Sequence, residues 1–411
     1  MRVYACIAFC FLIFFSAGVR AEQKLLYPAL LPRVTQLTDH ITNDRFGLTL
    51  QTFRKLLDSS RYSGLNKYNY HYRELYEQDS ISKLGILLTD AMLAYFTDLK
   101  VGRNEKGFVS YNEFATRSNK QDQDSIVNNL NSIRTASDIY NLAVGYEPTD
   151  KHYLLLKYTL RQAIEEGNFK AEQELQQSLN IYRWILHFKF RDYILVNIAS
   201  TQLRYHSVDS LVLDMKIVAG KPATKTPRFA AYLHQVIFYP YWHVPRSIAV
   251  NELLPRCKKN PHVLNSMNIQ VLNSNGTVVD PGSIDWAKLN KKNFPYTLRQ
   301  STGCDNALGI VKFNLTSPYS VYLHDTNLKS AFASQKRYLS HGCIRIEKPI
   351  ELAQILMPGK VDSNFLKSCI KGQKPITEVV KEPVPVFVVY MTADVVGMQV
   401  QYFPDIYNLL Q

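Results

Sequence analysis

The stretch that decides the fold runs from residue 321 to residue 349. It opens with Val-Tyr-Leu-His-Asp-Thr, continues through a polar loop, and closes with Ser-His-Gly-Cys-Ile-Arg-Ile-Glu-Lys-Pro. The apolar and aromatic residues from Ser320 to Leu323 predict a strand that ends at His324. Beyond the loop, Ile344 and Ile346 follow Cys343 in an alternating pattern. The loop is short enough to bring His324 and Cys343 together, so these two residues are the first candidates for chemistry.

A histidine beside a cysteine indicates nucleophilic catalysis. A thiol attacks only as the thiolate, and a nearby imidazole is the usual means of forming it. Peptide N–H groups around Gly342 and Cys343 are candidate donors to the oxyanion of a tetrahedral intermediate, an interaction that commonly lowers a barrier by about 3 kcal/mol. Gly342 also allows a backbone conformation that a Cβ atom would forbid. The natural reaction for this set is acyl transfer.

The complete pattern resembles a known family. His324, fifteen residues, and then Ser340-His341-Gly342-Cys343 are similar to the signature of L,D-transpeptidases, the cysteine enzymes that cross-link or modify peptidoglycan. Further segments resemble the large multidomain branch of that family: Gly220-Lys221-Pro222, Tyr241-Trp242-His243-Val244-Pro245, Ile284-Asp285-Trp286 and Asn306-Ala307-Leu308-Gly309. The resemblance is close from about Trp184 to Tyr407 and vague before that.

The resemblance implies an α+β protein with a mostly helical N-terminal domain and a β-rich catalytic domain. We expect a signal peptide over residues 1–21, a helical scaffold domain over 22–175, and the catalytic domain over 176–411 with a capping subdomain inserted over 240–298. Helical spacing of apolar residues supports helices over 84–99 and 150–164, with Thr149 or Asp150 as a cap of the second. The polar residues 118–124 are expected to form a loop.

Three departures from the family pattern stand out. Arg345 lies where smaller members carry asparagine, and Tyr239-Pro240 and Thr302 replace the usual Asn-Pro and proline. The peptidoglycan-binding module of large members is expected between Gly167 and Leu179, and only eleven residues separate these two positions here. We therefore predict that the module is missing or reduced to a stub, which puts independent glycan anchoring in doubt.

By resemblance, Cys343 attacks the third residue of a tetrapeptide stem, a diamino acid such as diaminopimelate, and releases the terminal D-alanine. An amine of a neighbouring stem then resolves the thioester, which gives a 3-3 cross-link in the cell wall and a role in cell shape. His324 serves as base and acid, and Asp325 orients the imidazole through its main-chain carbonyl. The remaining predicted substrate-binding residues are Tyr322, Ser340, His341, Gly342 and Arg345.

Several alternatives stay open at the level of sequence. The same chemistry can attach an outer-membrane protein to peptidoglycan or hydrolyse the stem, because the acceptor leaves no mark in the sequence. A non-catalytic wall-binding scaffold with a vestigial cysteine is the rival from another class. Arg345 either pairs with a stem carboxylate or braces its loop through Glu347 or Glu351.

The N-terminal segment predicts export from the cytoplasm. Arg2, the apolar run and Val19-Arg20-Ala21 predict a signal peptide cleaved after about Ala21, so we expect a periplasmic protein without a transmembrane anchor after processing. The net charge of +13 suits an anionic polymer such as the cell wall, and nucleic acid is an unexpected partner in that compartment. With Cys343 reduced, an oxidising compartment allows one disulfide among Cys257, Cys304 and Cys369, and the sequence decides neither whether it forms nor which two residues pair. No metal site and no cofactor are predicted.

Overall fold

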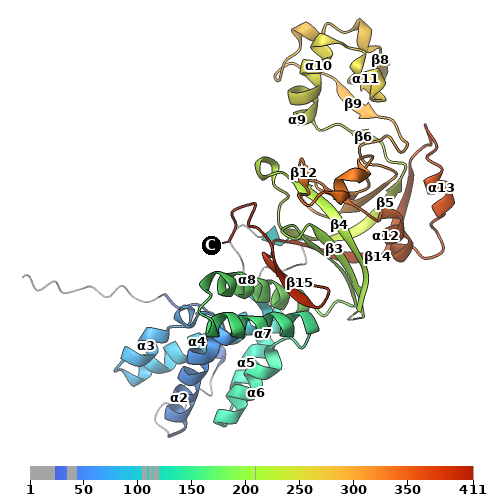
Figure 1. The fold of residues 1–411 in the computed structure, drawn as a ribbon. Helices are drawn as coiled ribbons and strands as arrows, with labels where there is room; N and C mark the ends of the chain where they lie inside the picture. Colours follow the sequence, from blue (N-terminus) through green and yellow to red (C-terminus); the bar gives the residue numbers. More distant parts are fainter. Residues whose placement is uncertain are drawn as a thin grey trace, which may run out of the picture.

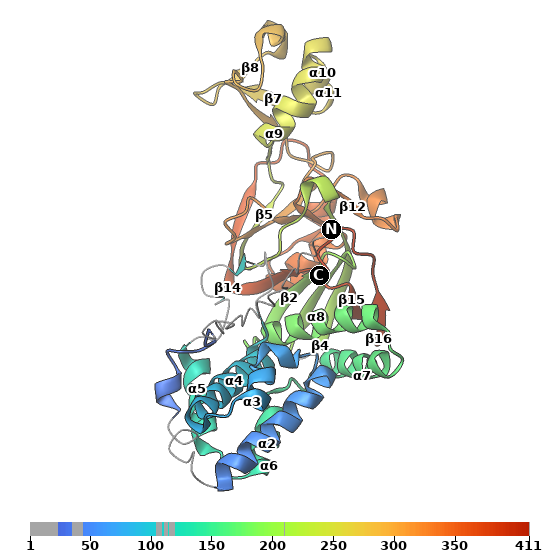
Figure 2. The same ribbon diagram turned by 90° about the vertical axis from the view of Figure 1, so that its left-hand side faces the viewer.

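The computed structural model describes residues 24–34, 44–103, 109–110, 114, 120–208 and 210–410. The predicted signal peptide therefore lies outside the described residues. In Figure 1 a helical region, a β-rich region and a smaller projecting subdomain follow one another along the molecule, and Figure 2 shows the same order from the side. Among the described residues no helix combines the length and the apolar character needed to cross a membrane.

The N-terminal part is helical, as predicted. Its helices are α2 (Asp44–Ser59), α3 (Tyr72–Glu77), α4 (Ile81–Val101), α5 (Lys120–Ser132), α6 (Ala136–Tyr146), α7 (Lys151–Glu165) and α8 (Phe169–Leu186). Helix α4 is buried along most of its length, because the side chains of α2, α5 and α6 close around it in one apolar core. The Asp150 side chain accepts hydrogen bonds from the N–H groups of His152 and Tyr153, so the predicted cap of α7 is confirmed.

The predicted loop over residues 118–124 is wrong for residues 120–124, and residues 118 and 119 lie outside the described residues. Residues 120–124 form the first turns of α5. The polar residues of this segment lie toward solvent or at its margin, while Ile126, Val127 and Leu130 of the same helix are buried. Residues 120–124 are polar and resemble a loop in sequence, because the apolar face of α5 begins only after them.

The β-rich part is a sheet that closes on itself. Its strands are β2 (Asp192–Asn197), β3 (Gln202–Ser207), β4 (Ser210–Gly220), β5 (Phe229–Phe238), β10 (Val311–Leu315), β11 (Leu323–His324), β13 (Ile344–Ile346) and β14 (Ile376–Val389). Neighbours follow the order β5-β10-β11-β13-β4-β3-β2-β14, and β14 pairs again with β5. Short strands β1 (Val109–Ser110) and β12 (Tyr338–Ser340) add to β5 and β4. Closure leaves few unpaired edges.

Each strand of this sheet has an inner and an outer face. Side chains such as Leu203, Phe313, Leu323 and Ile344 fill the inner face and form one apolar cluster. On the outer face, Leu195 and Phe387 pack with α7, α8 and the hairpin of β15 (Ala393–Val396) and β16 (Gln399–Tyr402). Outer positions elsewhere on the sheet therefore remain available for polar side chains.

The residues expected to form a capping subdomain build a small unit with its own core. A sheet of β6 (Trp242–His243), β9 (Thr297–Gln300), β7 (Ile269–Leu272) and β8 (Val278–Val279) packs against α9 (Arg246–Ile248), α10 (Leu254–Lys259) and α11 (Val263–Ser266). Trp286 is buried in this core and its Nε1 donates to the Pro281 carbonyl at 2.8 Å. Trp286 is therefore part of the local core of this subdomain.

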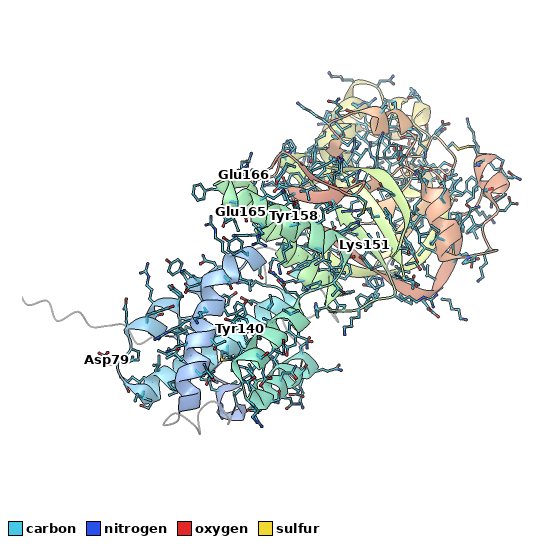
Figure 3. All side chains as sticks on the ribbon, turned by 60° about the horizontal axis from the view of Figure 1, so that its bottom comes forward. Asp79, Tyr140, Lys151, Tyr158, Glu165 and Glu166 are labelled. Carbon is cyan, nitrogen blue, oxygen red and sulfur yellow. A yellow bond between two sulfur atoms is a disulfide. The ribbon has the colours of Figure 1, made fainter. Side chains whose placement is uncertain are left out.

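Helices α7 and α8 form a hairpin joined by residues 166–168 alone. The labels Lys151 and Glu165 in Figure 3 mark the two ends of α7, and Glu166 opens the turn. No further domain is inserted at this point, where the sequence predicts a missing module. The expected domain boundary between residues 175 and 176 falls inside α8, whose residues contact both α4 and β15.

Candidate active site

Strand register gathers the predicted catalytic residues on one face. Lys312 of β10 pairs with His324 of β11, and His324 pairs with Arg345 of β13. Paired residues of neighbouring strands project on the same side of a sheet, and so do residues two positions apart. Tyr322 and Cys343 therefore share this outer face with them, while Leu323 and Ile344 point into the core. The register therefore places His324 and Cys343 on the same face of neighbouring strands, with Cys343 two positions before the residue that pairs with His324.

Cys343 is a free thiol at the start of β13. Its Sγ lies 3.6 Å from the Ser320 carbonyl oxygen, and Tyr322 supplies hydrogen bonds from its backbone and its side chain. Burial raises the pKa of the thiol, while the Tyr322 hydrogen bonds and the charges of Lys312 and Arg345 offset part of that effect. The sulfur is therefore a thiol at rest and needs a base to become a nucleophile.

His324 is positioned to be that base. Its Nδ1–H donates to the main-chain carbonyl of Asp325 at 2.5 Å, which leaves Nε2 as the atom that accepts a proton. The side chain is buried, and burial together with the positive charges of Arg345 and Lys312 lowers the pKa of His324 to about 3. The imidazole is thus neutral near pH 7. The main-chain contact is the one that the family resemblance implies for Asp325.

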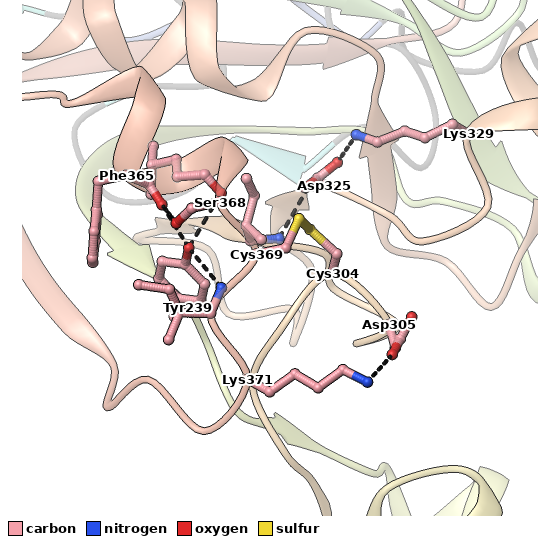
Figure 4. The surroundings of a disulfide bond; sticks show 12 residues. Tyr239, Cys304, Asp305, Asp325, Lys329, Phe365, Ser368, Cys369 and Lys371 are labelled. Carbon is pink, nitrogen blue, oxygen red and sulfur yellow. Dashed lines mark hydrogen bonds and ion pairs between the residues drawn. A yellow bond between two sulfur atoms is a disulfide. The ribbon is translucent and has the colours of Figure 1, made fainter.

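The carboxylate of Asp325 serves the loop instead. It accepts hydrogen bonds from the N–H groups of Ile310 (3.0 Å) and Thr326 (2.7 Å) and forms an ion pair with Lys329, which Figure 4 shows. Gly309 has a φ of +57°, and a Cβ atom there would lie 2.2 Å from the carboxylate. Glycine at this position lets Asp325 hold the strand end that carries His324.

The turn before Cys343 is held by its own hydrogen bonds. The Ser340 hydroxyl donates to the Cys343 carbonyl at 2.6 Å and accepts from the Gly342 N–H at 3.1 Å. Gly342 has a φ of +119°, so the expected special conformation is present. The Gly342 N–H is already engaged, however, which leaves the Cys343 N–H as the oxyanion donor of this turn. Ser340 is buried, and both of these hydrogen bonds of its hydroxyl group stay within the turn.

His341 joins the turn to the capping subdomain. Its Nε2 lies 2.7 Å from Oε1 of Glu252, a residue of the short π-helix Ala249–Leu253. Both side chains are roughly half exposed. Sequence analysis did not find Glu252, because nothing in residues 240–298 shows which of them reaches a loop ninety positions later.

Two cations flank the sulfur without an acidic partner. Among the residues that the structure describes, neither Lys312 nor Arg345 forms an ion pair, and the proposed pairing of Arg345 with Glu347 or Glu351 is absent. The carboxylate of Glu347 accepts instead from the Lys216 N–H at 3.1 Å. Lys312 lies with its Nζ 4.2 Å from the Tyr322 ring centroid, and burial lowers the pKa of both cations. Sequence reasoning missed Lys312, since only strand register places it beside His324.

The disulfide that the sequence left open joins Cys304 to Cys369. Figure 4 shows it beside Tyr239, whose hydroxyl donates to the carbonyl of Phe365 at 2.8 Å. The bridge ties the loop before β10 to the segment before β14. Cys257 is free and fully buried in the capping subdomain, so Cys343 is the accessible free thiol of the described chain.

Two family descriptions match parts of this chain. Residues 191–380 match the L,D-transpeptidase catalytic domain (YkuD), and residues 41–160 match a domain described as the scaffold domain. A Haemophilus influenzae protein named "Putative L,D-transpeptidase" is 30% identical over 339 residues, which is 81% of this chain and 68% of that protein. The chain belongs to the L,D-transpeptidase family.

Solved structures of this family were matched as well. An Enterococcus faecium L,D-transpeptidase mutant shares 16% identity with a TM-score of 0.21, over 49% of this chain and 50% of that one. The catalytic domain of the E. faecium enzyme acylated by ertapenem shares 16% identity with a TM-score of 0.23, over 48% of this chain and 97% of that one. The present chain thus spans about half the length of the longer of these two proteins.

Proposed function

We propose that this L,D-transpeptidase forms 3-3 cross-links in peptidoglycan of the periplasm, after cleavage of its leader near Ala21. The observation that carries the proposal is the outer face of β10, β11 and β13, where one free thiol, one neutral imidazole and two unpaired cations meet. A nucleophile, a base and a carboxylate-binding pair are what cleavage of an acidic stem peptide requires.

The reaction has two steps. His324 takes the proton of Cys343 at Nε2, and the sulfur attacks the carbonyl of the third stem residue. The carbon–nitrogen bond to D-alanine breaks as its amine receives that proton, which leaves a thioester. The amine of a neighbouring stem then attacks the thioester, His324 accepts its proton, and the proton returns to the released sulfur.

The cations supply substrate selection in this proposal. A diaminopimelate residue carries a side-chain carboxylate, and Arg345 can hold it by two parallel hydrogen bonds. Lys312 adds a second positive charge on the same face. Because neither cation has an acidic partner among the described residues, binding such a carboxylate breaks no existing ion pair.

Mass spectrometry of muropeptides tests the proposal. Purified protein incubated with tetrapeptide-stem muropeptides should release D-alanine and form 3-3 dimers, and Cys343→Ala should form none. Cys257→Ala is the matched control and should retain activity, because that thiol is buried away from the face. Ertapenem, which acylates the E. faecium catalytic domain, should give an adduct on Cys343 alone. Equal products from Cys343→Ala and wild type would refute the mechanism.

A further inference from the structure

A cavity lies away from Cys343, between the helical part and the closed sheet. Its volume is about 1200 Å³. The start of α7, the end of α8, strand β3 and the turn between β15 and β16 form its walls. Ligand sites commonly measure about 300–1,000 Å³, so this cavity has room for a chain of several rings. None of the residues of the candidate active site lines it.

Strand β3 presents an unusual polar face to this cavity. Gln202, Arg204 and His206 alternate with the core residues Leu203 and Tyr205, so all three point outward into the cavity. Arg204 and His206 are nonetheless only 2% and 6% exposed. Three polar residues on one buried strand face are costly unless their polar atoms find partners.

Several of these polar atoms have no protein partner. Within the described part of the chain, nothing hydrogen-bonds to Gln202 Oε1, Arg204 Nε, His206 Nε2 or Asp214 Oδ1. Asp214 of β4 is the register partner of Arg204, so the four atoms occupy neighbouring positions. A buried polar atom without a partner costs about 1–3 kcal/mol, and four together point to a group that arrives from outside.

Aromatic rings also line the cavity. The Tyr193 and His206 rings stack with centroids 4.7 Å apart, and the His152 ring lies 6.0 Å from that of His206. Burial lowers the pKa of His206 to about 3, and it also lowers the pKa of His152. Both imidazoles are therefore neutral near pH 7 and offer ring faces and one acceptor nitrogen each.

Three charged side chains in the walls are paired within the protein. Arg204 forms a buried ion pair with Asp394, Lys100 pairs with Asp122, and Glu147 pairs with Lys157. Lys151, Lys189 and Arg191 also line the cavity, beside the open donors and acceptors and the ring faces. Hydroxyl and acetamido groups both donate and accept hydrogen bonds, and the apolar faces of sugar rings suit aromatic side chains.

We propose that this cavity binds a saccharide, a segment of the glycan strand that carries the stem peptides. The inference rests on the proposed function, since it takes peptidoglycan as the substrate, and it adds a binding site for the polysaccharide part. A site between the helical part and the sheet would hold the polymer while the stems reach the Cys343 face. It would also supply glycan contact to a chain in which α7 and α8 are joined by three residues.

Binding of chitotetraose, an N-acetylglucosamine tetramer without stem peptides, tests the site. The full chain should bind it with a Kd in the millimolar range or tighter by calorimetry, and so should Cys343→Ala. Gln202→Leu and Asp214→Asn should each weaken binding at least tenfold, because the first removes an open acceptor and the second replaces one carboxylate oxygen with an N–H donor and removes the negative charge. Gln401→Leu is the matched control, an exposed strand residue outside the cavity, and should bind as wild type does.

Hydrogen exchange locates the ligand and separates the two proposals. Chitotetraose should slow exchange in residues 150–153 and 202–207. Gln202→Leu and Asp214→Asn that keep wild-type melting temperatures and still bind with wild-type affinity would overturn the inference, as would protection confined to residues 322–345. If ertapenem acylates Cys343 while no saccharide binds, this inference fails alone. If saccharide binds but Cys343 is never acylated, the proposed function fails and the saccharide site stands.

Discussion

His324 and His206 are both buried histidines on the outer face of one closed sheet, and both have a pKa near 3. Their neighbours differ. His324 has Nδ1 fixed by a carbonyl and shares its face with a free thiol and two unpaired cations. His206 stacks on Tyr193 and faces a cavity whose lining residues include no cysteine. A shifted pKa therefore does not identify a catalytic histidine here, and the groups around the ring do.

The sharpest test of this comparison is the same substitution at both positions. His324→Gln should lower the rate of Cys343 acylation by about 10²–10⁴-fold, because the proton acceptor is lost. His206→Gln should change that rate by less than about threefold, because this ring lies away from the thiol. Stopped-flow fluorescence with ertapenem measures both rates. Similar losses of acylation rate in the two variants would show that His324 has no role in catalysis that His206 lacks.

A smaller effect is expected from the cations of the catalytic face. Arg345→Gln removes a positive charge that lowers the pKa of Cys343, so the alkaline inflection of the acylation rate should move to higher pH. At pH 7.5 the rate should fall, because a smaller fraction of the thiol is then ionised. Lys312→Met should act in the same direction. Arg256→Gln, an exposed change of the same charge in the capping subdomain, should leave the profile unmoved.

The smallest effect concerns stability, and there the two histidines should behave alike. The folded pKa of each lies near 3, below the ordinary value of 6.5. The unfolded chain therefore binds more protons between these values, and stability that is complete above about pH 6.5 is lost as the pH falls. Each histidine contributes a slope of up to about 1.4 kcal/mol per pH unit.

Urea unfolding between pH 7 and pH 4.5 measures that slope. His206→Gln and His324→Gln should each flatten the decline of the unfolding free energy by a similar amount. A variant that keeps the full wild-type slope would show that its histidine is protonated in the folded state.

Much of the site follows from sequence because it is local. The signature residues His324 and Cys343 sit at the ends of two short strands, and a short loop with a turn-forming Gly342 sets their approach. The helices of the N-terminal part follow from apolar periodicity, and the α+β class is what the family resemblance implies. The start of α5 was missed because its first turns carry no apolar face.

The remainder depends on contacts between distant segments. Lys312 joins the site only through the register of β10 with β11, and Glu252 only through the placement of the capping subdomain. The choice of Cys304 and Cys369 as a pair depends on where two loops meet. The Gly342 N–H, expected as an oxyanion donor, is occupied by Ser340, a detail of turn geometry that residue types do not reveal.

Helix α8 has one further consequence. It is a single unbroken element whose residues contact α4 in the helical part and β15 beside the sheet. Because one continuous helix packs against both parts, a rotation of one part relative to the other has to break contacts of α8. A force on the helical part is transmitted to the sheet through the backbone hydrogen bonds of α8. Loss of either part removes apolar contacts that stabilise this helix.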